Sequence, residues 1–482
     1  MQRGIGAVGI AGFVAAAVSI GWATGRLDQR IFDDEVLTLL AVEGRGYGEL
    51  IRFHLGGHDV HPPLSFLWFR LLHDLGAPHW LQRGLSLAMA AAGFALVLDL
   101  VWRRLPDGAT ASRALAVVLF LGAPLLYGMG AALRWYPLLA LPVALAIWSA
   151  LGRGRPTMAA AICLGLAANV SFLAIVPALA YLVWRYFMAG RFDAAWDGPF
   201  LIVLGVLAAP GLLAFAMSVE IIPAQFDTNP LAALGMTAIG LAGGYGLGLT
   251  QSALAVPLVL LGAAGLFGGL LALRRPSIGD LLGVAILMAV LCLPIAAAGF
   301  AKPRSFLFML PFLLSAVVLG GFSLPWRNGH ALATAIASLA VTAAALWLLN
   351  FNDHPFKRNL HIEDGPIVQT VRDLARREQA IVVSSEPGLG RRLRAEGYCV
   401  LAASLPGGCE RRDAPVIVMI DDGTLAHRQG FAGTVAGLAR GHRLAEQRLF
   451  GNDEDAPLKS MLGARHVPKF LVSLSVYRRD PL

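Results

Sequence analysis

Charge is scarce in this chain. Only 15% of its 482 residues are Asp, Glu, Lys or Arg, whereas 57% are hydrophobic and the mean hydropathy is +0.65. A soluble globular protein normally carries charge on about a quarter of its residues. The shortage argues against a soluble protein. It favours a polytopic α-helical membrane protein, because each transmembrane helix needs about 20 predominantly apolar residues.

Cys-x-x-Cys motifs and glycine-rich phosphate-binding loops are also missing. The four cysteines include no Cys-x-x-Cys pair and no zinc-ligand spacing, and the chain has no P-loop and no internal repeat. The sequence therefore gives no sign of a structural zinc site or of a nucleotide held by a glycine loop. Cys163 and Cys292 lie in apolar stretches, where we expect them to be small core residues.

The basic residues that are present follow a pattern. The formal net charge of +8 would suit either a nucleic-acid partner or an excess of arginine at the cytoplasmic ends of transmembrane helices. Alternate loops hold the excess, which favours the second explanation and no nucleic-acid partner. The basic residues of these loops are Arg103, Arg104, Arg113, Arg153, Arg155, Arg185, Arg191, Arg274, Arg275 and Arg327.

The apolar stretches predict about eleven transmembrane helices. The first, Gly4–Thr24, is longer than the apolar part of a usual signal peptide, so we expect an uncleaved span. Asn169 and Ser171 are expected to mark a tight reversal inside the apolar stretch 157–187. The further spans are expected at 81–102, 114–133, 135–151, 157–168, 172–187, 199–218, 252–273, 280–300, 305–324 and 330–350.

The C-terminal segment, 351–482, is expected to form a second domain after a transmembrane domain of residues 1–350. With the N-terminus in the cytoplasm, an odd number of spans places this segment outside it, and the expected location is the plasma (inner) membrane. Cys399 and Cys409 both fall in the segment, and that compartment permits a disulfide bond between them. Alternating helix and strand patterns predict a small α/β domain. Its expected helices are Pro366–Gln379 and Leu389–Glu396, and its expected strands are Ala380–Ser385, Val416–Asp421 and Phe470–Tyr477.

The first long polar interval, 26–80, is expected to be an outer loop at the membrane surface. Asp33, Asp34 and Glu35 open one helical pattern in it, and a second pattern follows Pro63, so two interfacial helices are expected. A carboxylate that faces a cavity here would accept a proton from an attacking hydroxyl. The alternative is that the acids only cap the helix, because acids suit its first turn and its dipole.

Histidines cluster in the same interval. His54, His58 and His61, together with Asp59, are able to bind a divalent metal, to contact phosphate, or to act as ordinary hydrogen-bonding residues. The candidate metal ligands are His58, Asp59 and His61, and the sequence establishes no cofactor. Pro62 and Pro63 are expected to start the second helix, because proline suits the first helical turn.

Three basic residues oppose the arginine pattern. Arg134, Lys302 and Arg304 fall in loops on the expected outer side, where basic residues are otherwise scarce. An anionic ligand on that side would explain them. The alternative is that their side chains extend from helix ends into the interface.

These motifs resemble those of the GT-C class of membrane glycosyltransferases, over roughly Met1–Asn350. The nearest branch contains bacterial protein mannosyltransferase-like enzymes, the aminoarabinose transferase of lipid A and rhizobial galacturonosyltransferases. Asp34 with Glu35 matches the acidic pair of these families. The segment His61-Pro62-Pro63-Leu64 matches their H/K-P-P-L motif, whose basic residue approaches the donor phosphate.

Two later segments extend the resemblance. Arg134 with Tyr136 resembles the family's Arg-x-Tyr, and Arg304 followed by Pro311 resembles its Arg-aromatic segment. Ser305 departs from the pattern, since the family usually has an aromatic residue after that arginine. His61 stands where the aminoarabinose branch has lysine, which weakens any transfer of that branch's substrate to this chain.

The resemblance implies a glycosyltransferase that uses a polyprenyl-phosphate sugar on the outer side of the membrane, with inversion. The acceptor would be an envelope lipid, glycan or protein. The rival interpretations are a transporter or flippase of an anionic lipid-linked solute and a non-catalytic envelope scaffold. Asp34 is the implied base, with Glu35 and Asp33 beside it. The implied phosphate-binding residues are His61, Arg134, Tyr136, Lys302 and Arg304.

Overall fold

The computed structural model forms two compact units. One contains Met1–Gln29, Ala41–Asn352 and Leu462–Ala464, and the other contains Arg30–Leu40, Asp353–Met461 and Arg465–Leu482. The expected division at 351 stays a prediction. The structure describes residues 4–27, 33–56, 59, 61–106, 109–218, 230–243, 263, 266–273, 275, 278–297, 303–323, 364–378, 380–384, 390, 393–394, 396–402, 409, 414–421, 437, 440–450 and 472–479.

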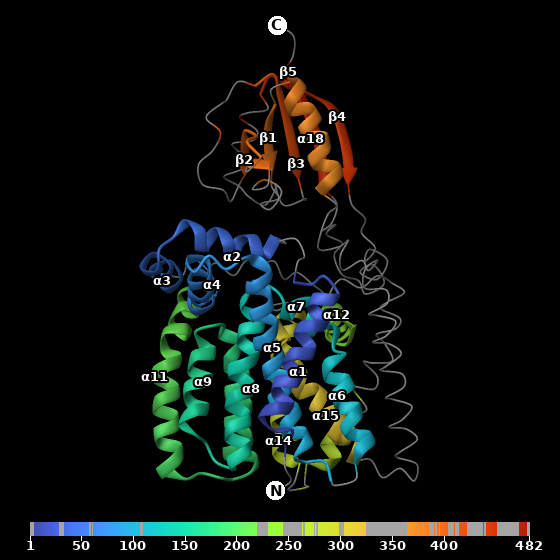
Figure 1. Cartoon of the computed structure of the whole chain (residues 1–482). Coiled ribbons are helices and arrows are strands. Elements are labelled where there is room, and N and C mark those ends of the chain that lie inside the picture. Colours follow the sequence, from blue (N-terminus) through green and yellow to red (C-terminus); the bar gives the residue numbers. More distant parts are fainter. Residues whose placement is uncertain are drawn as a thin grey trace. The chain divides into compact units, whose positions relative to one another are not determined.

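The first unit is a bundle of apolar helices (Figure 1). Six helical segments are long and apolar enough to cross a membrane: Gly6–Ala23, His79–Trp102, Ser112–Gly130, Trp135–Arg153, Ala194–Ser218 and Gly279–Ala297. Shorter apolar helices are Met158–Ala168, Phe172–Met188 and Leu310–Gly320. The expected span 330–350 and most of 252–273 lie outside the described residues. The number of spans therefore stays a prediction.

The helices of the bundle are named in chain order in Figure 1. They are α1 (Gly6–Ala23), α3 (Tyr47–Leu55), α4 (Leu64–Asp74), α5 (His79–Trp102), α6 (Thr110–Leu121), α7 (Pro124–Gly130), α8 (Trp135–Arg153), α9 (Met158–Ala168), α10 (Ile175–Leu182), α11 (Ala194–Ser218), α12 (Pro230–Gly243), α14 (Gly279–Ala297) and α15 (Leu310–Ser323). Helix α12 lies outside the spans that are expected from the sequence.

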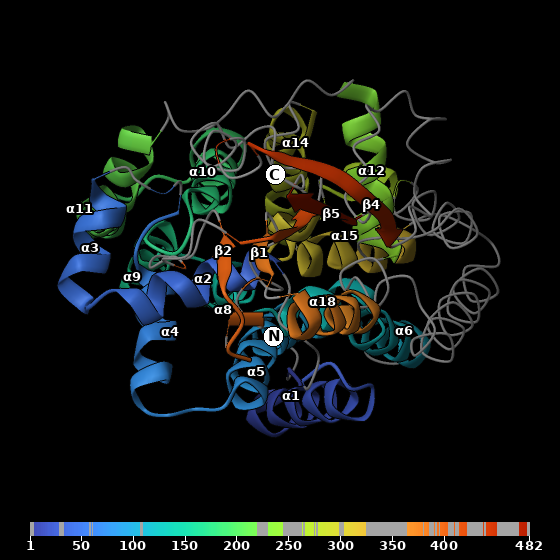
Figure 2. The ribbon, with the colours of Figure 1, turned by 90° about the horizontal axis from the view of Figure 1, so that it is seen from above.

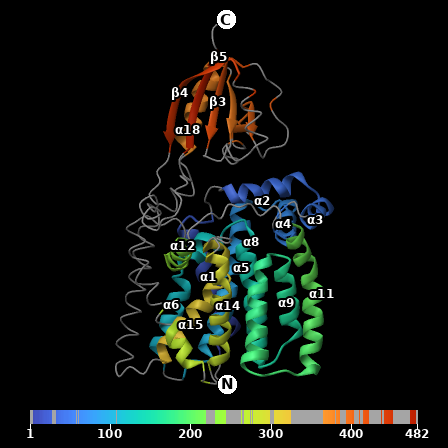
Figure 3. The ribbon, with the colours of Figure 1, turned by 180° about the vertical axis from the view of Figure 1, so that it is seen from behind.

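Small residues let these helices pack closely. A Cβ atom at Gly93 of α5 would lie 2.7 Å from the backbone oxygen of Ala140 in α8. A Cβ atom at Gly211 of α11 would lie 2.2 Å from the backbone oxygen of Ala168 in α9. Close backbone approach at small residues is the common way in which helices associate inside membranes. Figure 3 shows α8, α9 and α11 side by side.

The first polar interval forms three helices, so the expectation of two is wrong. They are α2 (Asp33–Gly44), α3 and α4. The apolar periodicity of the sequence does not reveal helix α3, because the helix is only nine residues long and includes Gly48. Its start is nevertheless well formed, since the Glu49 side chain accepts a hydrogen bond from the backbone N–H of Gly46. As expected, helix α4 begins directly after Pro62 and Pro63, at Leu64.

The chain reverses at Asn169, as the sequence predicts. Helix α9 ends at Ala168, and the Ser171 side chain caps the next short turn. The Asn169 side chain donates hydrogen bonds to the carbonyl oxygens of Gly165 (2.9 Å) and Leu207 (2.6 Å). The Asn169 carbonyl in turn accepts a hydrogen bond from the backbone N–H of Leu64, at 3.1 Å. This reversal therefore holds the start of α4 against the bundle.

The two ends of the bundle differ in chemistry. Helices α3 and α4 lie across one end, which we call the His61 end (Figures 1 and 2). At the opposite end, the Asp99 end, carboxylates in or beside apolar helices pair with arginine and tryptophan. Arg103 forms an ion pair with Asp99 at 2.6 Å, and Trp148 donates to the same carboxylate at 2.8 Å. Arg185 likewise pairs with Asp197 at 2.9 Å.

The second unit contains a five-stranded mixed sheet. Its order is β2 (Val400–Ala402), β1 (Ile381–Ser384), β3 (Val416–Asp421), β5 (Val472–Arg479) and β4 (His442–Phe450). Strand β1 is parallel to β2 and β3, whereas β5 is antiparallel to β3 and β4. Helix α18 (Asp364–Glu378) packs Ile367, Val368 and Val371 against one face of the sheet.

The small α/β domain is confirmed in its central elements. Helix α18 and strands β1, β3 and β5 lie where they are expected, and Cys399 forms the expected disulfide bond with Cys409. Strands β2 and β4 are not predicted by the sequence analysis. In β4 the described side chains are exposed or half-buried, so the strand lacks the apolar alternation that would reveal it. Most of the expected helix Leu389–Glu396 lies outside the described residues.

Candidate active site

The acidic cluster begins a helix. Helix α2 starts at Asp33, so Asp33, Asp34 and Glu35 occupy its first turn, as expected. The Glu35 side chain is 0% exposed. The side chains of Asp33 and Asp34 lie outside what the structure describes. A carboxylate as fully buried as Glu35 has a cost that hydrogen bonds or cations must offset, so its position is not that of a plain surface cap.

His61 is held by two contacts along the polar interval. The Asp59 carboxylate accepts a hydrogen bond from the backbone N–H of His61 at 2.9 Å, which is the short-range turn that aspartate favours. The Nδ1 atom of His54 lies 2.8 Å from the His61 carbonyl oxygen. A carbonyl only accepts, so His54 carries a proton on Nδ1. Burial holds the pKa of His54 below its usual 6.5, and the neutral tautomer with the Nδ1 proton follows.

The ring of His61 meets the start of α8. Arg134, in extended conformation, is the residue before α8 and is 8% exposed. Its Nη2 atom lies 3.5 Å from His61 Nε2. Because arginine only donates, the histidine nitrogen faces it as an acceptor. The Trp135 ring lies 5.4 Å from the His61 ring and 4.8 Å from the Tyr136 ring, measured between centroids.

The late segment reaches the same place. The guanidinium carbon of Arg304 lies 5.9 Å from the centre of the Tyr136 ring, within the range of a cation–π contact. Arg304 belongs to a short 3₁₀ turn, Pro303–Phe306. The turn also includes Ser305, which departs from the family pattern and is 9% exposed. The side chain of Lys302 lies outside the described residues. The structure thus brings together His61, Arg134, Tyr136 and Arg304, which come from three distant parts of the sequence.

Two further arginines at this end are not among the site residues expected from the sequence. Arg83, near the start of α5, is 0% exposed and its Nη1 atom donates to the Ala131 carbonyl oxygen at 3.3 Å. Ala131 belongs to the short loop that leads into Arg134. Arg26 follows α1 and is also buried; burial, and then the positive charge of Arg83, lowers its pKa to about 9. The sequence does contain a signal for Arg83, because an arginine inside an apolar span is usually functional.

The described residues do not assemble a metal site. Among them, no group of three or more His, Cys, Asp or Glu side chains lies close enough to hold a metal ion. Asp59 and His54 are instead engaged with the backbone of His61. His58 lies outside the described residues, so the candidate set His58, Asp59 and His61 stays a prediction.

Comparisons with known proteins concern the fold. Protein-family models and curated proteins gave no match. ArnT from Cupriavidus metallidurans in the apo state aligns with a TM-score of 0.55 at 13% identity, over 97% of each chain. ArnT bound to undecaprenyl phosphate gives 0.50 at 14% identity, again over 97% of each chain. Arabinofuranosyltransferase AftD from Mycobacteria gives 0.50 at 16% identity, over 100% of this chain and 40% of AftD. As the sequence resemblance predicts, this multi-pass membrane protein has the fold of the GT-C glycosyltransferases.

Proposed function

We propose that the chain is a glycosyltransferase that moves a sugar from a polyprenyl-phosphate donor to an envelope lipid, glycan or protein. The observation that carries the proposal is the meeting of His61, Arg134 and the Tyr136–Arg304 pair at one end of a bundle with the GT-C fold. The fold neighbour ArnT has been solved with undecaprenyl phosphate bound. The His61 end, on this proposal, faces outside the cytoplasm.

The charges at this end suit the donor's phosphate. In a polyprenyl-phosphate sugar the phosphate is a diester with one negative charge, and it departs as a monoester with a second charge developing. Arg134 and Arg304 would therefore bind the leaving group more strongly as the sugar–oxygen bond breaks. Interactions that strengthen in this way lower the reaction barrier, whereas uniform binding does not.

The acidic start of α2 would supply the base. An acceptor hydroxyl attacks the anomeric carbon from the face opposite the phosphate, and its proton passes to the carboxylate of Asp34. One carbon–oxygen bond forms to the acceptor, and one breaks to the phosphate, which keeps the electron pair. A single displacement inverts the anomeric configuration. No nucleotide takes part, so the chain has no need of a glycine-rich phosphate loop.

A transporter or flippase is the second candidate. Transporters usually place their ionisable groups near the middle of the membrane, on interrupted helices. The charged residues described above lie near helix ends instead: Arg134 precedes α8, and Arg26 follows α1. This placement supports an enzyme at the membrane surface over a route through the bundle.

Transfer of labelled sugar by the purified protein tests the proposal. The protein in detergent is given a polyprenyl-phosphate donor with a labelled sugar and an extract of envelope lipids and glycans. Label that leaves the isoprenoid and enters the acceptor fraction supports a transferase. The flippase would be established instead if the label stays on the isoprenoid and the labelled lipid crosses the membrane of vesicles that contain the protein.

A further inference from the structure

Trp135 has a buried hydrogen-bond donor that the site described so far does not use. The side chain is 3% exposed at the first position of α8. Its Nε1 atom is buried and has no hydrogen-bond partner among the residues that the structure describes. An indole N–H only donates, and buried polar groups are nearly always paired. The position of this donor therefore calls for an acceptor.

The surroundings of Trp135 indicate which acceptor. Its ring lies between two side chains of the candidate site, 5.4 Å from the His61 ring and 4.8 Å from the Tyr136 ring. Arg134, whose Nη2 atom reaches His61, directly precedes it in the chain. A donor that is neutral and buried beside cations suits an anionic oxygen, since a charged acceptor makes the stronger hydrogen bond.

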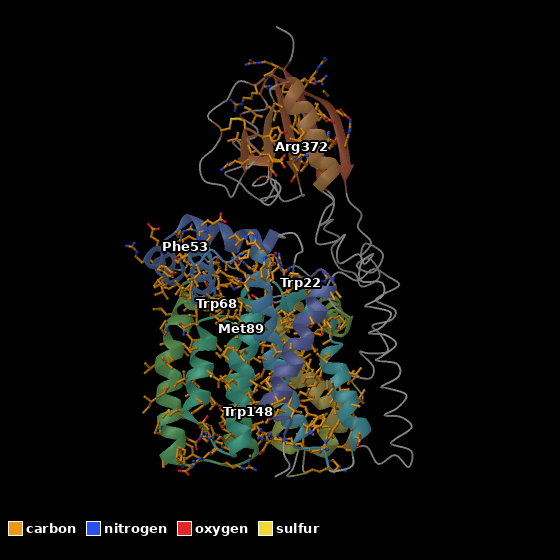
Figure 4. All side chains as sticks on the ribbon, viewed as in Figure 1. Trp22, Phe53, Trp68, Met89, Trp148 and Arg372 are labelled. Atoms are coloured by element: carbon orange, nitrogen blue, oxygen red, sulfur yellow. A yellow bond between two sulfur atoms is a disulfide. The ribbon has the colours of Figure 1, made fainter. Side chains whose placement is uncertain are left out.

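Two other tryptophans of the bundle already have a partner for this N–H. At the Asp99 end, Trp148 donates to Asp99 at 2.8 Å and Trp184 donates to Asp280 at 2.9 Å. The Nε1 atom of Trp68 in α4 also has no hydrogen-bond partner among the described residues, but this side chain is only half-buried. Trp135 and Trp148 lie on the same helix, and Figure 4 shows Trp148 near the Asp99 end of the bundle. Helix α8 thus has a paired indole at one end and a donor available to a ligand at the other.

We propose that the Nε1–H of Trp135 donates a hydrogen bond to a phosphate oxygen of the polyprenyl-phosphate donor, beside Arg134. This inference rests on the proposed function and extends it by one binding residue. Trp135 would fix the orientation of the phosphate, because a single N–H is directional, while the arginines supply most of the attraction. Trp135 would also keep its aromatic contacts with His61 and Tyr136 when the phosphate is bound.

Binding of undecaprenyl phosphate to the purified protein in detergent tests the inference. Trp135→Phe keeps an aromatic ring and removes the N–H. Replacement of Trp135 by 3-benzothienylalanine keeps the two-ring shape as well, so it separates the donor from the packing. We expect both changes to raise the Kd for undecaprenyl phosphate about tenfold or more, as for loss of a hydrogen bond to a charged group. The benzothienyl variant should unfold at the wild-type temperature without lipid.

Trp148→Phe is the matched control. It removes an N–H that already has a partner within the protein, so it should lower the unfolding temperature and leave the Kd unchanged. If the benzothienyl variant binds the lipid as tightly as the wild type, the inference is wrong even where Arg134→Ala weakens binding. If that variant loses stability without lipid, as Trp148→Phe does, the Trp135 N–H has a partner within the protein and the inference also fails. Wild-type protein that does not bind undecaprenyl phosphate would instead overturn the proposed function.

Discussion

The Nη2 atom of Arg134 lies 3.5 Å from Nε2 of His61, although 73 positions separate the two residues in the sequence. The contact joins the first polar interval to the start of α8. His61 is itself held through its backbone by Asp59 and His54. The arginine is therefore placed by a chain of contacts that begins outside the membrane-spanning helices.

Removal of either arginine should weaken donor binding. Arg134→Ala and Arg304→Ala each take away a charge-assisted contact with phosphate, so we expect the KM for the donor to rise about tenfold to a hundredfold. We expect kcat to fall as well, because both arginines hold the phosphate as it leaves. The rate of sugar transfer at varied donor concentration measures this change. Arg191→Ala is the control, because Arg191 pairs with Asp280 on an exposed part of the bundle. An equal rise in KM for the control would contradict a specific role.

His54 should make the folded protein less stable in acid. Burial lowers the pKa of His54 in the folded protein, so the unfolded chain takes up its proton first as the pH falls below 6.5. The free energy of unfolding should therefore decrease from pH 6.5 downward and show no contribution from His54 above pH 7.5. Thermal unfolding of the wild type and of His54→Gln at pH 7.5 and 5.5 checks this. The variant should lose less stability between the two values; an equal loss would show that His54 is not responsible.

The packing of α9 against α11 should depend on Gly211. A methyl group at this position would lie 2.2 Å from the Ala168 backbone oxygen, so Gly211→Ala must push the two helices apart. We expect a loss of about 1 to 3 kcal/mol in the free energy of unfolding. Gly205→Ala on the same helix is the matched control, because no atom lies within 4 Å of the added methyl group. Equal unfolding temperatures for the two variants would refute the close approach.

The sequence predicts most of the bundle because apolarity and length determine a transmembrane helix. The reversal at Asn169 was predictable for the same reason: polar side chains interrupt one long apolar stretch. Helix α3 and strand β4 were not, because α3 is short and contains glycine, and β4 lacks apolar alternation. Contacts with other parts of the chain contribute to both elements, since Leu50 of α3 is buried with Ala41 and Phe66 and β4 pairs with β5.

The candidate site was predictable in its members but not in its contacts. Arg134 and Arg304 stood out because they oppose the arginine pattern of the loops. Arg83 does not stand out in this way, because residues 81–102 have the pattern of an apolar span. The missing partner of the Trp135 N–H depends on which atoms surround the ring. That information exists only once α8, His61 and Tyr136 are packed together.

The last prediction concerns the base. Asp34→Asn keeps nearly the same volume and much of the capping ability at the start of α2, so expression and membrane insertion should survive. If Asp34 accepts the acceptor's proton, transfer should fall about 10²- to 10⁴-fold, as is typical when general-base catalysis is lost. If the acid only caps the helix, activity should stay near normal and stability should change by about 1 kcal/mol or less. Sugar transfer by the purified variant, with its unfolding temperature recorded alongside, separates these outcomes.

Substitutions of the acidic residues near Asp34 serve as controls for this experiment. Asp33→Asn changes the same helical turn, so it should retain most of the transfer rate if Asp34 is the base. A wild-type rate for Asp34→Asn would move the assignment to Asp33, Glu35 or Asp59. Of these, Asp59 already accepts a hydrogen bond from the backbone of His61, and Glu35 is fully buried. If Asp33→Asn, Asp34→Asn, Glu35→Gln and Asp59→Asn all leave transfer intact, proton removal by a carboxylate of this interval is not part of the mechanism.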